Sequence, residues 1–366
     1  MIRLVPWRRT AVILGGTIVV VVIAAVALSR HVGDPAYLER RLSREIGTGY
    51  TVHIESSHYD LLQRTFSATG VTVIPDTLEH TTGRARRRTL SWVAVDAVHA
   101  DGVNLWDLQR GVVNVDDVRA EGLKIRVLLD RRIPSRYQGL RRLLPHEALN
   151  SSDKSVRFGT IRVVRGDIRY SEHGILSSRP GTIRFADFYA TVTNLRNDNR
   201  AQPCVIDVRT RFANSGLLNA TFKYDLSSDS LKMDYRLAMK EMDATALNPL
   251  LVDLKGIRIE RGTIDSLSAD ISVRNGVAVG SIRLPYHGLK FEVLDRDSHD
   301  RDLKDKLKTF MFSRSVEDSN PDEDEPVRVI NVRLRRGPSV SLIKFVWQTV
   351  REGTLRTVGI DPAQNS

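Results

Sequence analysis

An uncharged apolar segment near the amino terminus constrains this chain more than any other feature of its sequence. Residues 10–28 read TAVILGGTIVVVVIAAVAL and contain no charged side chain. A helix of this length spans roughly 28 Å, which matches the hydrocarbon thickness of a bilayer. The sequence therefore predicts a transmembrane helix within residues 10–29, and the location of everything that follows depends on it.

The flanks of this segment indicate its orientation. The tail at residues 1–9 is short and basic, whereas more than 330 residues follow the segment. Short basic tails stay in the cytoplasm while long domains are translocated. We therefore expect a single-pass protein with its amino terminus inside and the bulk of the chain outside. Two alternatives stay open, namely the opposite orientation and a cleaved signal peptide, because Ala25 and Ala27 form an A-x-A pattern.

Composition limits the chemistry of the translocated part. Cys204 is the only cysteine, so neither an intramolecular disulfide nor a cysteine-based zinc site is expected. The net charge is +11, which suits a lipid surface or an envelope polymer as partner, although an arginine-rich coding bias accounts for most of it. The basic run at 84–88 lacks interleaved aromatic residues, so we expect no nucleic-acid partner.

A short amphipathic helix is predicted directly after the membrane segment. Asp34 can cap it and Pro35 suits its first position. Leu38, Leu42 and Ile46 then recur every four residues. The pattern predicts a helix over residues 35–46.

Beyond residue 50 the hydrophobic period changes to two, which is typical of strands that bury one face. The clearest example is a predicted hairpin over 218–226 and 231–237. We predict that its alternating apolar residues line an apolar interior or groove: Leu218, Ala220, Phe222, Tyr224, Leu226, Leu231, Met233, Tyr235 and Leu237. Similar alternation predicts strands at 51–56, 66–75, 90–101, 112–118, 123–129, 156–164, 167–172, 182–195, 204–212, 256–265, 268–276, 277–284, 289–294 and 327–334.

These patterns predict a mainly β protein. One N-terminal transmembrane helix is followed by a long antiparallel β-sheet with short capping helices at both ends. The expected organisation begins with a cytoplasmic tail (1–9), the transmembrane helix (10–29) and a first β-rich half with its leading helix (30–129). A loop and boundary (130–153) then separates it from a second β-rich half (154–294). A charged loop (295–326) with a brief helix around 303–311, a final strand (327–336), and a C-terminal amphipathic helix and tail (337–366) complete the chain.

The C-terminal helix has one apolar side. Ser339 is its predicted N-cap. Trp and basic residues in such a helix favour the surface of a membrane. The alternative is that the helix plugs the open end of the sheet. The residues assigned to the membrane-facing side are Val340, Ile343, Val346, Trp347 and Val350.

No catalytic pattern emerges from the sequence. Nucleophile elbows, zinc-protease helices and glycine-rich phosphate loops are all missing. His99 with Asp101, and the charged run at 295–300, are better explained as solvated surface groups. We therefore expect no enzymatic activity, no metal and no cofactor.

The order of these parts resembles the AsmA-like family of bacterial envelope proteins, which are related to bridge-like lipid transfer proteins. Four stretches carry the resemblance: 38–62, 95–129, 242–294 and 320–359. It implies an inner-membrane anchor, a periplasmic domain whose long β-sheet is curled into a groove-like or taco-like form with an apolar interior, and a part in phospholipid transport or outer-membrane homeostasis. About 14 successive strands would make such a groove on the order of 65 Å long. The alternatives are a structural envelope protein with a filled β core, and an envelope enzyme.

Overall fold

The computed structural model describes residues 4–5, 34–46, 49–76, 88–104, 106–107, 110–134, 141–151, 154–175, 177–197, 202–294, 318–321 and 325–359. The predicted transmembrane helix at 10–29 and the brief helix around 303–311 lie outside the described residues. Within the described residues, no helix is both long enough and apolar enough to cross a membrane.

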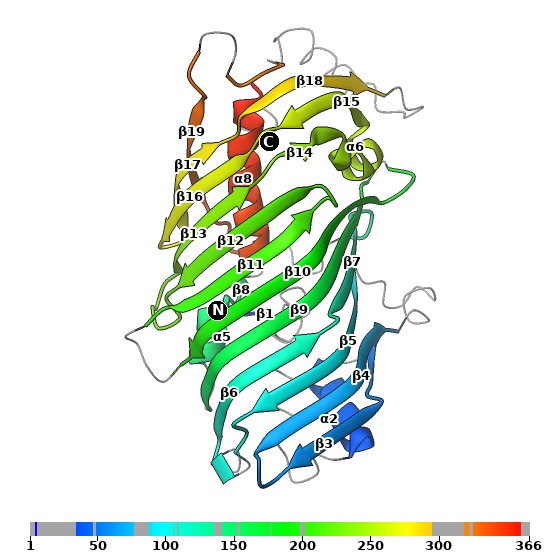
Figure 1. Ribbon diagram of the computed structural model, residues 1–366, viewed down its shortest axis with the longest axis vertical. Coiled ribbons are helices and arrows are strands. Elements are labelled where there is room, and N and C mark those ends of the chain that lie inside the picture. The colour runs from blue at the N-terminus through cyan, green and yellow to red at the C-terminus, as the bar shows by residue number, and fades with distance from the viewer. Residues whose placement is uncertain are drawn as a thin grey trace.

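The fold is mainly β and is built around one sheet of fourteen strands (Figure 1). The strands are β2 (Tyr50–His53), β3 (Ser56–Asp60), β4 (Thr65–Pro75), β5 (Thr89–Asp101), β6 (Val112–Glu121), β7 (Lys124–Asp130), β9 (Ser155–His173), β10 (Gly181–Arg196), β11 (Cys204–Phe212), β12 (Gly216–Tyr224), β13 (Lys232–Met239), β16 (Leu267–Arg274), β17 (Val277–Arg283) and β19 (Val329–Arg335).

The sheet is mixed, so the prediction of a purely antiparallel sheet is wrong. Its order is β19-β17-β16-β13-β12-β11-β10-β9-β6-β5-β4-β2. Strands β6 and β7 both pair with β9 in parallel, in one constant register from Val112↔Ser155 to Asp130↔His173. Parallel neighbours need a long crossover connection. The segment at 131–154 supplies it, and the sheet continues across this point.

Two of the fourteen strands add no width to the sheet. Strand β7 lies in line with β6, between β5 and β9, and β3 lies in line with β2 beside β4. Gly122 adopts a φ of 65° at the break between β6 and β7, a conformation that glycine tolerates without steric cost. Twelve strand positions at about 4.8 Å give a length of roughly 50 Å, which is shorter than expected.

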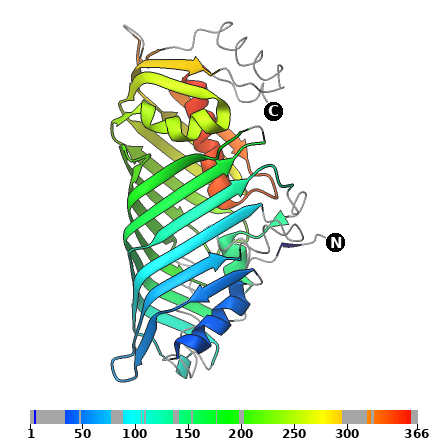
Figure 2. The ribbon, with the colours of Figure 1, turned by 90° about the vertical axis from the view of Figure 1, so that its right-hand side faces the viewer.

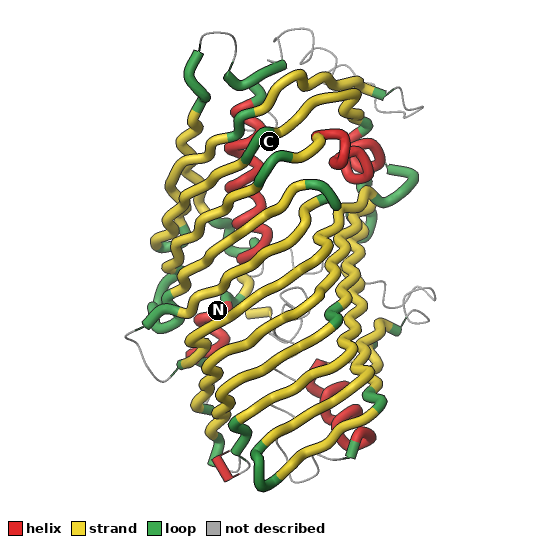
Figure 3. Tube along the Cα trace, in the orientation of Figure 1, coloured by secondary structure: helices red, strands yellow, loops and turns green. Residues whose placement is uncertain are grey.

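Smaller elements complete the fold. Figure 3 shows the long strands crossing the molecule obliquely, with the helices set apart from one another. A three-stranded sheet and a two-stranded parallel sheet accompany the large one: β14 (Met242–Asp243), β15 (Ile257–Ile264) and β18 (Tyr286–Val293); β1 (Leu4–Val5) and β8 (Arg141–Arg142). The helices are α2 (Pro35–Ile46), α5 (Pro145–Asn150), the 3₁₀ turn η2 (Ala244–Leu247), α6 (Asn248–Lys255) and α8 (Leu342–Thr357).

Helix α2 confirms the predicted helix over residues 35–46. The Asp34 carboxylate accepts a hydrogen bond from the Ala36 N–H at 3.0 Å. Leu38 and Leu42 are buried in the core. The Glu39 carboxylate accepts from the N–H of Ile54, at 2.8 Å, and this bond ties the helix to the segment that joins β2 to β3. Figure 2 shows α2 and α8 on the same side of the sheet, toward opposite ends of the molecule.

Helix α8 begins later than predicted. Ser341 is its N-cap, with its hydroxyl accepting from the Lys344 N–H, so the assignment of Ser339 is wrong. The helix packs on β17 and β19. Contact is close because Gly353, which has no side chain, faces Ile282.

Part of the predicted charged loop at 295–326 is held in place by hydrogen bonds at Asn320. Asn320 is buried, exchanges two backbone hydrogen bonds with Tyr286, and donates its amide to the Leu284 carbonyl at 2.7 Å. Its side-chain oxygen accepts from the Arg328 N–H at 2.8 Å. Because both the NH₂ group and the oxygen of this buried amide have hydrogen-bond partners, the chain is held in one position here.

Candidate functional site

The nine residues predicted to line an apolar interior come together in the structure. Ladder pairs place Ala220 opposite Leu237 and Phe222 opposite Tyr235. Directly opposed residues point to the same face of a sheet, so seven of the nine share one face. Leu226 and Leu231 flank the hairpin turn and join the same core. Six are buried and three are partly buried, the latter being Leu218, Phe222 and Leu237.

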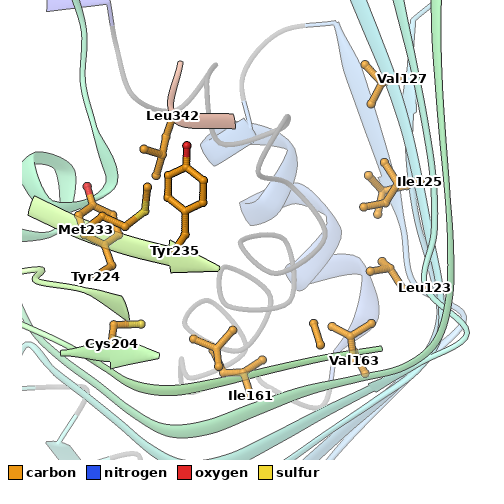
Figure 4. Close-up of a cluster of buried hydrophobic side chains, with 14 of the residues drawn as sticks. Leu123, Ile125, Val127, Ile161, Val163, Cys204, Tyr224, Met233, Tyr235 and Leu342 are labelled. Carbon is orange, nitrogen blue, oxygen red and sulfur yellow. The ribbon is translucent and has the colours of Figure 1, made fainter. Parts of the chain in front are cut away.

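This face is concave, and buried apolar side chains from most strands of the sheet make up its surface. Figure 4 shows side chains of β7, β9, β12 and β13, together with Leu123, projecting from the curled sheet toward a common interior. They belong to one hydrophobic cluster that begins at Leu38 of α2 and ends beyond α8 at Val358. The alternation of apolar and polar residues along most of the strands is the cause, because it gives one face to the interior and the other to water.

Aromatic side chains form the centre of this face. The rings of Phe222 and Tyr235 lie 5.7 Å apart, centroid to centroid. Tyr235 also lies beside Thr349 of α8, and burial raises the pKa of its phenol to about 12. The ring therefore stays neutral, which suits contact with hydrocarbon.

A buried polar pair interrupts the apolar surface. The Nδ1 atom of His146, in α5, lies 2.6 Å from the Tyr224 hydroxyl, in β12. Burial lowers the pKa of His146, so the ring is neutral at pH 7. Its other nitrogen, Nε2, is buried and has no hydrogen-bond partner in the described part of the chain. The pair can exchange a hydrogen bond with a polar group that enters the interior.

Sequence reasoning did not single out this histidine, because residues 130–153 were interpreted as a loop with room for one helical turn. A signal was available. Pro145 is the first residue of α5, and the Glu147 carboxylate accepts from the N–H of Leu144 at 2.8 Å. Proline followed two residues later by glutamate is typical of a helix start.

Basic side chains gather around one buried carboxylate at the end of β9. Tyr170 donates its hydroxyl to Glu172 at 2.6 Å, and Arg131 forms an ion pair with the other carboxylate oxygen. Burial lowers the pKa of Lys255 and Lys344, and the charge of Arg131 lowers both further. Cations outnumber the acid here, so this region can attract an anionic group.

The predicted membrane-facing side of the C-terminal helix is divided in the structure. Ile343 and Trp347 are exposed, but Val350 is buried against the sheet together with Leu342, Phe345 and Thr349. Val340 and Val346 are half-buried. The five residues do not form one exposed face, because the helix uses part of its apolar surface to cover β17 and β19.

The described residues contain no group of three or more histidine, cysteine or acidic side chains that could hold a metal ion. The Nε2 atom of His99 lies 3.2 Å from an Asp101 carboxylate oxygen, and both side chains are exposed. The charged run at 295–300 lies outside the described residues. A depression of about 250 Å³ lies on the convex face, and it is lined by Asp187, Tyr189, Arg209, Arg211 and Leu217.

Comparison with known proteins yields no match, either to a protein-family model or to a curated protein. The apolar concave face is therefore the feature from which function has to be argued.

Proposed function

We propose that this chain is an AsmA-like envelope protein that handles phospholipid. Residues 10–29 anchor it in the bacterial inner membrane with the amino terminus in the cytoplasm. The β-rich part lies in the periplasm, where its concave face carries acyl chains in phospholipid transport or outer-membrane homeostasis. The continuous apolar concave face is the observation that supports this proposal most.

The physical argument starts from the need to bury that face. An apolar sheet face must be covered by a second layer. Among the described residues no second large sheet lies over it, and α2 and α8 contact the sheet near its two ends. Acyl chains are suitable partners, since removing a dozen methylenes from water is worth about 10 kcal/mol.

A structural protein with a filled β core is the second candidate, and burial favours it. Phe66, Ile161 and Ile271 on the apolar face each have 0% of their surface exposed. In that case the interior side chains satisfy one another and carry no cargo.

The proposed topology has one consequence for the smallest sheet. Strand β1 pairs with β8 through two residues only. In the anchored protein Leu4–Val5 would lie in the cytoplasm and Arg141–Arg142 in the periplasm, so this ladder would not form. The loss is small, because so short a pair of strands contributes little stability.

Native mass spectrometry of the full chain, extracted in mild detergent, tests the proposal. We expect bound phospholipid in the unaltered protein and several-fold less in Phe222→Glu, which puts a carboxylate on the concave face. The matched control is Asn219→Glu in the same strand, whose side chain is exposed on the convex face. A folded but lipid-free protein would favour the filled core. Equal lipid loss in both variants would contradict the assignment of the concave face.

A further inference from the structure

Two neighbouring turns at one end of the molecule expose large apolar side chains. Leu61 and Leu62 occupy the turn between β3 and β4, with 65% and 95% of their surfaces exposed. Trp106, between β5 and β6, is 68% exposed. Both turns lie at the lower end of the molecule in Figures 1 and 2. We call these three residues the apolar tip.

Hydrogen bonds fix the apolar tip in this arrangement. The Asp60 carboxylate accepts from the N–H groups of Leu62 and Gln63, at 2.8 and 2.9 Å. The Tyr59 hydroxyl donates to the Val103 carbonyl at 3.0 Å, and the Val103 N–H donates to the Arg64 carbonyl at 2.9 Å. The second turn is closed by the Asn104 side chain, which accepts from the Trp106 N–H at 3.0 Å. The two turns are thereby held side by side.

Folding of the chain does not require leucines at these positions. Asn, Asp, Gly and Ser are the usual turn residues, and an exposed leucine adds no burial energy. Leu62 is the most exposed large apolar residue in the described part of the chain. Adjacent exposed apolar residues, unlike scattered single ones, mark a surface that meets an apolar partner.

We propose that the apolar tip inserts into the interface of the bilayer that anchors the chain. Leucine and tryptophan are the residues that such an interface accepts. The tip lies at the same end of the molecule as α2. Five residues, Arg30 to Asp34, separate the predicted membrane span at 10–29 from α2, and they reach roughly 17 Å when extended. The anchor therefore holds this end of the sheet near the membrane.

The charges beside the two turns indicate insertion rather than electrostatic adsorption. Arg64 and Arg110 are accompanied by Asp60 and Asp107, so the described charges balance. Salt should have little effect on the contact. This inference rests on the membrane anchor of the proposed function but not on its lipid cargo.

A fluorescent probe at residue 62 tests the contact in the full chain. Leu62→Cys is labelled with an environment-sensitive dye and reconstituted in phosphatidylethanolamine–phosphatidylglycerol vesicles, with and without nitroxide-labelled lipid. Cys204 is buried and needs no replacement. The matched control is Val279→Cys on β17, which is 45% exposed. We expect blue-shifted emission and strong nitroxide quenching at position 62, several-fold weaker quenching at position 279, and little change in 0.5 M salt.

Other outcomes would overturn the inference. If the probe at position 62 is not quenched and its emission resembles that of the dye in water, the tip stays in solvent. If the emission of the probe is blue-shifted but nitroxide-labelled lipid does not quench it, the tip contacts a protein partner or a second copy of the chain instead. The added substitution Trp106→Ser should reduce quenching at position 62 several-fold without changing the amount of co-purified phospholipid. Release of the protein from vesicles by alkaline carbonate would instead contradict the anchor itself.

Discussion

His146 and Tyr224 are joined by a contact of 2.6 Å, between an imidazole nitrogen and a phenol oxygen, although 78 positions separate them in the sequence. The contact links α5, in the long crossover between β7 and β9, to the hairpin strand β12. It is one of the polar contacts that hold the crossover against the concave face. A second bond supports it, since the Asn150 amide donates to the Leu226 carbonyl at 2.9 Å.

Burial of His146 should make stability depend on pH. Its pKa is lowered in the folded protein, so below about pH 6.5 the unfolded chain binds a proton that the folded chain does not. The free energy of unfolding should therefore fall as the pH falls through this window. Urea unfolding in detergent at pH 7.5 and 5.5 measures it, and His146→Gln should reduce the difference between the two values. The exposed His58 provides the control, because His58→Gln should leave the difference unchanged.

Cys204 should not react with thiol reagents in the folded protein. It is buried opposite Tyr224, and burial raises the pKa of its thiol to about 12. At pH 8 this thiol therefore stays protonated, whereas the thiolate is the reactive form. Maleimide labelling followed by mass spectrometry should show no modification until denaturant is added. Rapid labelling without denaturant would show that the concave face opens at this strand.

Gly353 should be required for the packing of α8. A methyl group there would lie 3.0 Å from Cβ of Ile282 and closer still to its Cδ1 atom. Overpacking in Gly353→Ala should lower the free energy of unfolding by about 1–3 kcal/mol. Alanine has a higher helix propensity than glycine, and this offsets up to about 1 kcal/mol of the loss. Denaturant titration measures the change. Arg351→Ala, at an exposed position of the same helix, should change stability by less than about 0.5 kcal/mol.

The orientation of the amino terminus can be tested with paired cysteines. Leu4 faces Arg141 in the β1–β8 ladder, but the proposed anchor would put a membrane between them. In intact cells Leu4→Cys with Arg141→Cys should give no product with a short thiol cross-linker. The positive control is Lys232→Cys with Arg274→Cys, which face each other across β13 and β16. Efficient cross-linking of the first pair would contradict the proposed topology.

Sequence periodicity predicted local structure well but strand order less well. The period of four at Leu38, Leu42 and Ile46 predicted α2, and the period of two predicted the hairpin of β12 and β13. The parallel pairing of β9 with β6 and β7 was missed, because a strand shows the same alternation whether its neighbour is parallel or antiparallel. The apolar tip was missed as well, since a leucine pair in a turn shows no periodicity.

Side-chain alternation by itself determined that the protein is mainly β and which residues share a face, because the two sides of a strand are set by its pleat. The nine residues assigned to the hairpin interior follow from this local rule. Only the tertiary structure decided which strands are neighbours, that Ser341 rather than Ser339 caps α8, and that Val350 is buried while Trp347 is exposed. These features depend on contacts between segments far apart in the chain, and local periodicity carries no information about such contacts.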